Sequence, residues 1–393
     1  MKDLSNSELI NTFIKKVRKI YGNEYIPLHR PIFDDQEKIY TNEVIESNFV
    51  SSVGKKVDEF ENTFATFTNS KFAISTVNGT AALHVALKLC NVSPGDEVIT
   101  QSLTFVATCN AINYLGAKPI FIDVDKDSMG LSPEYLKKFL DANATKVNGI
   151  TINNKTGAKI AACVPMHSFG MPCRINEIKN ICLNWNIKLV EDCAESLGSY
   201  YMGEHTGNFG NFGVFSFNGN KVITTGGGGM LVTNNAELAR KAKHITTTSK
   251  IPHKYKFIHD EVGFNYRMPN INAAIGCAQM EKLDRFLSIK RKIASEYEDF
   301  FSELEVDYVK NYKNAESNFW LNTILMNSSK ERDSFLNATN DQGVMTRPAW
   351  TLMNKLTMFK NSQKDNLRNS QILEDTIINI PSSVPSSTEW FFK

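Results

Sequence analysis

Between about Lys71 and Val232, the sequence alternates short runs of apolar and β-branched residues with stretches of helical periodicity. Several of the short runs are apolar at every position, which is typical of strands buried on both faces of a sheet. This alternation predicts an α/β fold with a mostly parallel central sheet and helices on both faces. The predicted strands are Phe72–Val77, Asp96–Gln101, Lys118–Asp125, Lys159–Pro165, Ile187–Cys193, Val214–Phe217 and Gly229–Thr233. The predicted helices between them are Thr80–Leu89, Val106–Tyr114, Pro133–Leu140 and Ile175–Trp185.

The character of the chain changes after Ala236. A helical stretch to Ile245 is followed by a polar loop near Lys250–Asp260 and then by a long amphipathic pattern, Asn272–Phe300. The rest of the sequence has the mixed pattern of a smaller α+β domain. We therefore expect two parts. Residues 1–250 would form an N-terminal segment and the large α/β domain, and residues 251–393 an interdomain loop and the small C-terminal α+β domain.

Charge, hydropathy and cysteine usage disfavour several classes of protein. The 44 basic and 42 acidic residues nearly cancel and no long basic tract occurs, so we expect no nucleic-acid partner. The sequence has no secretory signal and no apolar run of the ~20 residues that a membrane helix needs, which favours a cytoplasmic protein without membrane contact. The seven cysteines are scattered among apolar neighbours without a CxxC pair. They are therefore expected to be reduced and buried, and not to form a zinc site.

The first motif that could carry chemistry is the turn Asn78-Gly79, where a predicted strand ends and a helix opens at Thr80. Free backbone N–H groups and the positive end of the helix dipole make such a turn suited to bind a phosphate. Gly79 lets the backbone approach an anion closely. An ordinary capped helix is the alternative, and for the turn taken alone it is the preferred interpretation.

Two more candidate residues follow predicted strands. Asp192 ends an apolar strand, and a carboxylate there could keep a heterocyclic nitrogen protonated, because a neighbouring negative charge favours the cationic form. Phe105 stands just after another strand, where its ring could stack on a planar cofactor. Each residue has a simpler alternative. Asp192 could cap a helix or form a structural salt bridge, and a single aromatic residue is more often part of the core.

The segment Val214–Met230 contains a candidate catalytic lysine. Lys221 sits in a polar turn between two apolar strands, five positions after Ser216 and shortly before the run Gly226–Gly229. A lysine traps carbonyl compounds once burial or a nearby cation lowers its pKa, and the hydroxyl of Ser216 could donate to a phosphate. A solvated loop lysine beside a flexible glycine run is the alternative. The glycines do not form a G-x-G-x-x-G nucleotide fingerprint, and no Walker sequence occurs.

Taken in their order along the chain, these motifs resemble the sugar-nucleotide aminotransferase family (DegT/StrS type) of fold-type-I pyridoxal-phosphate enzymes. The resemblance extends from roughly Pro27 into the C-terminal domain. Each motif is weak by itself, whereas the ordered set is specific. The matching segments are Ser51-Ser52-Val53-Gly54, Phe60-Glu61, Asn78-Gly79-Thr80, Thr104-Phe105, Glu191-Asp192, Ser216-Phe217 with Lys221, and Gly263-Phe264-Asn265-Tyr266-Arg267-Met268.

This resemblance implies a role for each candidate residue. Lys221 would hold pyridoxal 5'-phosphate as a Schiff base and move a proton between the α-carbon and the cofactor carbon, while Asp192 would pair with the pyridinium nitrogen. Phe105 would stack on the ring. The other implied cofactor contacts are Gly79, Thr80 and Ser216 at the phosphate, Glu195 near the ring hydroxyl where the family often has Gln or His, and Asn265 at the phosphate of a neighbouring subunit. The last contact implies a homodimer with shared active sites.

The resemblance also implies the reaction. An amino acid, expected to be glutamate, would donate its amino group to C4 of a nucleotide-linked 4-keto-6-deoxy sugar. The N-terminal segment and the stretch Arg347–Phe359 resemble members of legionaminic-acid synthesis, so the expected substrate is a UDP-linked 4-keto-6-deoxy-N-acetylhexosamine. Two positions depart from the family pattern, since Gly227 replaces a common Glu and Asn354 a common His. These departures leave the cofactor chemistry intact and bear on the identity of the substrate.

Two alternatives remain open at this point. One is an aminotransferase similar to GDP-perosamine synthase, which would use GDP-linked 4-keto-6-deoxymannose. The other is a non-catalytic regulatory protein that binds pyridoxal phosphate without transamination. The joint presence of Lys221, Asp192 and Asn265 argues against the regulatory protein. Lys221 also disfavours the related dehydratases, which have His at that position.

Overall fold

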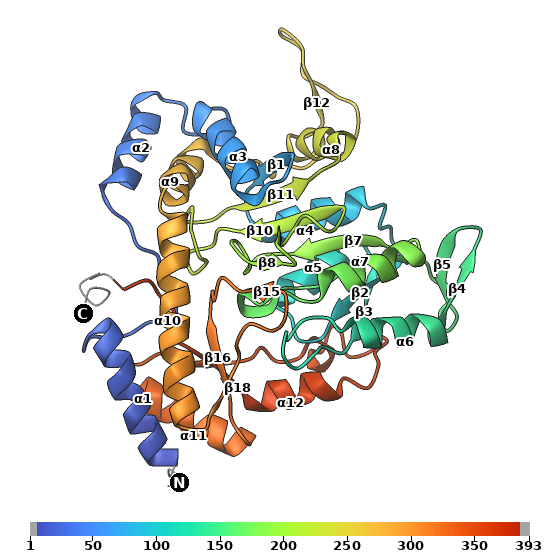
Figure 1. Cartoon of the computed structure of the whole chain (residues 1–393). Coiled ribbons are helices and arrows are strands. Elements are labelled where there is room, and N and C mark those ends of the chain that lie inside the picture. The colour runs from blue at the N-terminus through green and yellow to red at the C-terminus, as the bar shows by residue number, and fades with distance from the viewer. Residues whose placement is uncertain (1–5, 386–393) are drawn as a thin grey trace.

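A central sheet of seven strands organises the larger part of the molecule (Figure 1). The computed structural model describes residues 6–385. The strand order is β1-β11-β10-β7-β6-β2-β3, and neighbours run parallel except for β11, which is antiparallel to both β1 and β10. The strands are β1 (Phe72–Thr76), β2 (Glu97–Gln101), β3 (Lys118–Ile122), β6 (Ile160–Val164), β7 (Lys188–Asp192), β10 (Phe212–Ser216) and β11 (Gly229–Thr233). Each overlaps its predicted range, and the prediction of a mostly parallel sheet is confirmed.

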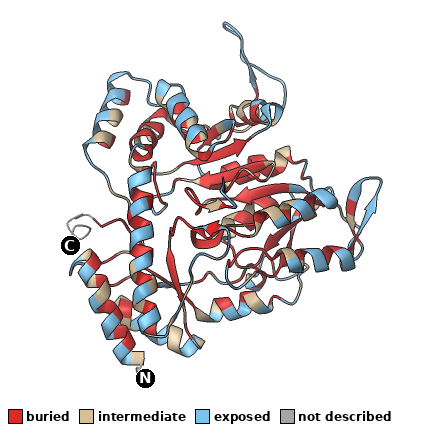
Figure 2. Ribbon diagram, in the orientation of Figure 1, coloured by how far each residue is buried: buried red, intermediate tan, exposed pale blue. Residues whose placement is uncertain are grey.

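Helices cover both faces of this sheet, as predicted (Figure 2). Val214 and Phe215 are neighbours on β10, yet they belong to different apolar clusters because successive side chains of a strand point to opposite faces. Both are fully buried, which explains why the strand is apolar at every position. The helices of one face are α4 (Gly79–Leu89), α5 (Val106–Tyr114) and α8 (Ala236–Thr246). Those of the other face are α3 (Lys55–Thr68), α6 (Pro133–Asn143) and α7 (Ile175–Asn184).

A four-stranded antiparallel sheet, in the order β14-β16-β18-β17, forms the centre of the smaller part. Its strands and nearby helices are β14 (Asp307–Tyr308), β16 (Asn322–Leu325), β17 (Arg347–Pro348), β18 (Ile377–Ile380), α10 (Leu283–Glu303), α11 (Ser329–Asp341) and α12 (Arg368–Thr376). Helix α1 (Asn6–Tyr21) comes from the opposite end of the chain but packs against α11, and Ile26 forms a bridge with Val344 (Figure 1). The start of the chain thus lies beside the C-terminal elements, and the boundary near residue 250 stays a prediction.

The single amphipathic pattern Asn272–Phe300 forms two helices, α9 (Asn270–Met280) and α10. The chain leaves the helix at Glu281-Lys282, where the ammonium of Lys282 lies 2.9 Å from Oδ1 of Asp34. Asp34 is the N-cap of α2 (Asp35–Glu46), so the break links α2 to the junction of α9 and α10. Apolar periodicity continues across this junction, which is why the sequence pattern did not predict it.

The predicted polar loop near Lys250–Asp260 is a narrow hairpin of β12 (Lys250–Ile251) and β13 (Ile258–His259) that projects from the body of the molecule (Figure 1). Its tip carries aromatic side chains, since Tyr255 is 74% and Phe257 81% exposed. The remaining short strands are β4 (Ala144–Val147), β5 (Ile150–Asn153), β8 (Tyr200–Tyr201), β9 (Glu204–His205) and β15 (Ala315–Glu316).

Two expectations about the chain as a whole can be compared with the structure. All seven cysteines are buried and unpaired, which confirms their prediction as small buried apolar residues. Within residues 6–385, no helix is both long enough and apolar enough to cross a membrane.

Candidate active site

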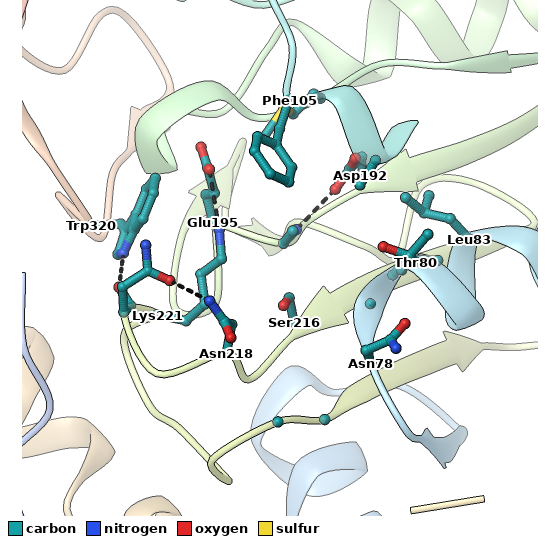
Figure 3. A pocket seen from close by; sticks show the side chains of 18 of the residues that line it. Asn78, Thr80, Leu83, Phe105, Asp192, Glu195, Ser216, Asn218, Lys221 and Trp320 are labelled. Carbon is teal, nitrogen blue, oxygen red and sulfur yellow. Dashed lines mark hydrogen bonds and ion pairs between the residues drawn. The ribbon is translucent and has the colours of Figure 1, made fainter. Parts of the chain in front are cut away.

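A cavity of about 370 Å³ opens at the carboxyl ends of β7 and β10 (Figure 3). This is the edge of an open α/β sheet at which ligands usually bind. The cavity is lined by every predicted site residue except Asn265, namely Gly79, Thr80, Phe105, Asp192, Glu195, Ser216 and Lys221. Figure 3 shows Lys221, Glu195 and Trp320 on one side of the pocket and Asn78 and Thr80 on the other. The predicted residues come from four separate stretches of the sequence and meet in one place.

Asp192 is the last residue of β7 and is 2% exposed. The hydroxyl of Thr108 donates to its Oδ2 at 2.7 Å, and the backbone N–H of Ala194 donates to Oδ1 at 3.1 Å. Burial raises the pKa of the Asp192 carboxyl, and these two hydrogen bonds oppose the rise only in part. The arrangement holds a carboxylate in a fixed orientation between neutral donors, where a cationic partner would stabilise it.

The other acid of the pair, Glu191, has a structural task. Its carboxylate accepts hydrogen bonds from the backbone N–H groups of Gly207, Phe209 and Gly210 at 2.7 to 2.8 Å. Its Oε2 also lies 3.3 Å from the imidazole of His167. These contacts anchor the segment that leads into β10, so of the two neighbouring acids Asp192 alone lines the cavity.

Lys221 lies in the turn after β10 and its side chain is 13% exposed. Its Nζ is 3.2 Å from Oε1 of Glu195 and 4.2 Å from the centre of the Trp320 ring. The turn itself is fixed, because the Lys221 N–H donates to the carbonyl of Asn218 and the indole N–H of Trp320 donates to the carbonyl of Asn220 at 2.7 Å. The amine is thereby held at the wall of the cavity rather than in bulk solvent.

Glu195 faces this amine from the segment that follows β7. Its Oε2 accepts the backbone N–H of Phe169 at 2.8 Å, and the residue is 2% exposed. Burial raises the pKa of Glu195 to about 7, the nearby ammonium of Lys221 lowers it, and the negative charge of Asp192 raises it further. The Glu195 carboxyl therefore changes its charge near neutral pH.

The first turn of α4 forms the opposite wall. The side chain of Asn78 accepts the N–H of Ala81 at 2.7 Å and so caps the helix, while the first-turn amides of Gly79 and Thr80 have no acceptor within the helix. A Cβ on Gly79 would lie 3.0 Å from the Cβ of Ser216. Glycine here lets the helix start and the serine hydroxyl approach each other. A helix N-terminus beside a hydroxyl is suited to an anion.

The structure places the remaining predicted residues in different surroundings. Phe105 is the N-cap of α5 and its ring is 48% exposed where it lines the cavity. Asn265 lies outside the cavity on an exposed loop. It forms an isolated antiparallel β-bridge with Thr247, and its side chain accepts a hydrogen bond from Nε of Arg267 at 3.1 Å. Of the two departures from the family pattern, Gly227 lines the cavity, whereas Asn354 is buried and accepts the hydroxyl of Ser102 at 2.6 Å.

Two tryptophans of the pocket were not among the predicted site residues. Trp320 and Trp350 both line the cavity and both come from the smaller part of the molecule. Trp350 belongs to the stretch Arg347–Phe359 that resembles a substrate-binding segment, so a signal for it existed. Trp320 stands far from Lys221 in the sequence and is flanked by ordinary apolar residues, so its contact with the lysine arises from tertiary structure alone.

Comparison with known proteins places this pocket in context. A model described as the DegT/DnrJ/EryC1/StrS aminotransferase family matches residues 31–390. GDP-perosamine synthase of Escherichia coli O157:H7 is 38% identical over 369 residues, covering 93% of this chain and 95% of that protein. The putative pyridoxal phosphate-dependent aminotransferase EpsN of Bacillus subtilis is 35% identical, covering 87% and 84%. The crystal structure of a DegT DnrJ EryC1 StrS aminotransferase from Brucella abortus superimposes with a TM-score of 0.82 at 25% identity, covering 90% of this chain and 92% of that one.

Proposed function

This chain belongs to the DegT/DnrJ/EryC1/StrS aminotransferase family, and from that premise we propose that it aminates the keto carbon of GDP-linked 4-keto-6-deoxymannose with glutamate as donor. It is a pyridoxal-phosphate-dependent sugar aminotransferase. The observation that carries the proposal is that the amine of Lys221, the carboxylate of Asp192 and the first turn of α4 share one cavity. Pyridoxal phosphate needs these three groups: an amine for its aldehyde, a carboxylate for its ring nitrogen and an anion site for its phosphate.

The residues of the cavity fit pyridoxal phosphate. Asp192 is buried and its hydrogen-bond partners, Thr108 and Ala194, are neutral. A protonated ring nitrogen would supply the opposite charge that lowers the raised pKa of this carboxyl. The half-exposed ring of Phe105 offers an apolar face for a planar heterocycle, since such a ring is rarely left uncovered in a binding pocket.

When bound, pyridoxal phosphate supplies the electron sink for removal of the proton at the α-carbon of the amino acid. In the proposed mechanism Lys221 would hold the cofactor through Nζ and, once the amino group of the incoming amino acid has displaced Nζ, would serve as the general base that takes this proton. Asp192 would keep the proton on the ring nitrogen, and the hydroxyl of Thr108 fixes the orientation of the Asp192 carboxylate. Glu195 lies within hydrogen-bond reach of Nζ and orients the amine.

The phosphate would be held by the first-turn amides of Gly79 and Thr80 together with the hydroxyl of Ser216. We further propose that Asn265 completes this anion site in a second copy of the chain, so that the active enzyme is a homodimer. Its position outside the cavity of its own chain favours a task in another chain. Each dimer would then contain two equivalent sites built from both subunits.

The nucleotide of the substrate is proposed from the relatives. The curated relative with 38% identity is named GDP-perosamine synthase, which favours a GDP-linked sugar with a 4-keto group. The second candidate is the UDP-linked 4-keto-6-deoxy-N-acetylhexosamine of a legionaminic-acid pathway, which the resemblance of Arg347–Phe359 favours. Both candidates require the same chemistry at Lys221 and differ in the sugar and the base.

The cofactor chemistry can be tested by absorption spectroscopy. The purified protein with pyridoxal phosphate should show a visible band that glutamate bleaches, and Lys221→Ala should lack this band. Lys16→Ala is the matched control, because Lys16 pairs with Glu296 far from the cavity. A wild-type protein that shows no band with excess pyridoxal phosphate would contradict the assignment of Lys221.

The substrate can be tested with the glutamate-bleached protein. Addition of the correct keto sugar should restore the visible band and form an amino sugar detectable by mass spectrometry. We expect GDP-linked 4-keto-6-deoxymannose to act at least about tenfold faster than the UDP-linked candidate, because a pocket that hydrogen-bonds one base discriminates against another. The reverse order of rates would favour the legionaminic-acid assignment.

A further inference from the structure

Three aromatic side chains meet in the wall of the pocket. The indole of Trp350 stacks on the ring of Phe169, with centroids 4.7 Å apart and planes inclined by 26°. The same indole lies 6.2 Å from the ring of Phe105. Trp350 and Phe105 line the cavity that holds Lys221, whereas Phe169 is fully buried. One face of the Trp350 indole is therefore covered by a core residue, and the cavity lies beside it.

Phe169 is held in an unusual conformation that fixes this arrangement. Its φ of 57° lies in the left-handed region, which non-glycine residues seldom adopt and which occurs preferentially at functional sites. Its N–H donates to Oε2 of Glu195 at 2.8 Å, and its carbonyl accepts the N–H of Leu321 at 3.2 Å. Phe169, on which the indole stacks, is therefore hydrogen-bonded to Glu195, the residue that faces Lys221.

The backbone that carries Trp350 is also fixed. The N–H of Leu352 donates to Oε1 of Glu374 at 3.0 Å, and the N–H of Met353 donates to the carbonyl of Ser102 at 3.0 Å. Ser102 directly follows β2, so the second bond attaches the segment after Trp350 to the carboxyl edge of the central sheet, while the first attaches it to α12. The indole is thus oriented before any ligand binds.

Trp320 and Trp350 both line the cavity, but they differ in how far their indoles are buried. Trp320 is 4% exposed, and its indole N–H is bound to the carbonyl of Asn220. Trp350 is only partly buried, although it is packed against the same core cluster. A large indole that lines the cavity and is left partly uncovered is a candidate for ligand contact.

The chemistry of the cavity indicates which part of the substrate the indole meets. The reacting keto carbon must reach the cofactor that would lie between Lys221 and Asp192, so the sugar ring enters this cavity and the nucleotide base lies farther out. The C–H groups on the faces of a pyranose ring carry partial positive charge, and the face of an indole is negative. We propose that Trp350, backed by Phe169, determines substrate specificity by stacking the indole face turned away from Phe169 on the sugar ring of the keto substrate.

This inference rests on the proposed function, and its test separates the two half-reactions. Trp350→Phe keeps an aromatic face, whereas Trp350→Leu keeps bulk without one. Trp185→Phe is the control, because Trp185 ends α7 away from the cavity. In Trp350→Leu we expect KM for the keto sugar to rise about tenfold, and in Trp350→Phe to rise by less than about threefold. Bleaching of the visible band by glutamate should change less than the keto-sugar step.

Binding supplies a readout that does not depend on turnover. A nucleotide sugar without a keto group should bind Trp350→Leu about tenfold more weakly than wild type in calorimetric titration, whereas the free nucleotide should bind both proteins alike. Equal losses in the glutamate and keto-sugar steps would overturn the proposal, as would a Leu variant that behaves like the Phe variant. A wild-type protein that binds nucleotide sugars but aminates none would refute the proposed function alone, since the binding comparison still tests Trp350.

Discussion

At the carboxyl end of β7, Asp192 is 2% exposed and both of its carboxylate oxygens accept hydrogen bonds from this chain. On the projecting hairpin of β12 and β13, Phe257 is 81% exposed, and Asn265 lies nearby in sequence on an exposed loop. By the family resemblance, Asp192 of the first region and Asn265 of the second would both contact pyridoxal phosphate. The difference teaches that one chain positions the floor of the pocket by itself, whereas the region from the hairpin to Asn265 has the uncovered apolar surface that a second protein surface would bury.

The largest loss of activity should come from a substitution in the buried region around Asp192. In Asp192→Asn we expect turnover to fall by about 1,000-fold, because an amide cannot keep the ring nitrogen protonated. Steady-state kinetics with the keto sugar would measure it. Glu97→Gln is the matched control, since Glu97 is a buried acid at the opposite edge of the sheet that bonds Asn153. Equal losses in the two variants would mean that Asp192 acts through stability alone.

The second prediction tests whether the exposed region acts in another subunit. Asn265→Ala and Lys221→Ala should each be nearly inactive. When the two are unfolded together and refolded as a mixture, about a quarter of wild-type activity should return, because half of the dimers are mixed and each contains one intact site. The absence of any recovery would place Asn265 and Lys221 in the same functional site of one chain.

A smaller effect is expected from the tip of the hairpin. Tyr255→Ser combined with Phe257→Ser should raise the dissociation constant of the dimer by about a hundredfold or more, since each of the two aromatic rings that loses its buried position costs about 1.5–3 kcal/mol. Sedimentation at several concentrations would measure this constant. Leu183→Ser is the control, because Leu183 is comparably exposed on α7. An unchanged constant in the hairpin variant would assign its aromatic side chains another partner.

The smallest effect concerns the pH dependence of stability. Burial raises the pKa of Glu195 from 4.5 to about 7, so folding disfavours the charged form of this carboxyl. The cofactor-free protein should lose about 1 kcal/mol of stability through Glu195 as the pH rises from 6 to 8, because the unfolded state has already released this proton while the folded state keeps it up to about pH 7. Urea unfolding of wild type and Glu195→Gln at both pH values would reveal the difference. A wild type and variant that respond identically to pH would show that Glu195 does not titrate in this range.

The sequence pattern brought the residues of the buried region to one edge of the sheet for a physical reason, while their roles stay a prediction. Asp192 and Ser216 stand at the ends of apolar strands, Lys221 follows one of them, and parallel strands bring their carboxyl ends to a common edge. Such positions can be predicted from local pattern and topology.

Other features depend on distant contacts and left no local trace. Trp320 covers Lys221 from the loop that precedes β16 in the smaller part, and α1 packs beside α11 although the two helices are far apart in the sequence. Two-residue strands such as β14 are too short for any periodicity to show. The reversed direction of β11 is equally hidden, because a buried strand has the same apolar composition whichever way it runs.

That reversal has a consequence for how the protein is made. β11 joins β1 to β10, and its first residue, Gly229, is paired with both Thr76 and Ser216 at the edge where the anion site lies. Residues 72 and 233 are partners in the same ladder, so the wall that carries Gly79 cannot close until the ribosome has synthesised the chain beyond residue 233. Contacts this distant in sequence form late and slowly. Capture of the cofactor should therefore mark the completed large sheet, and a nascent chain that stops short of β11 should leave pyridoxal phosphate in solution.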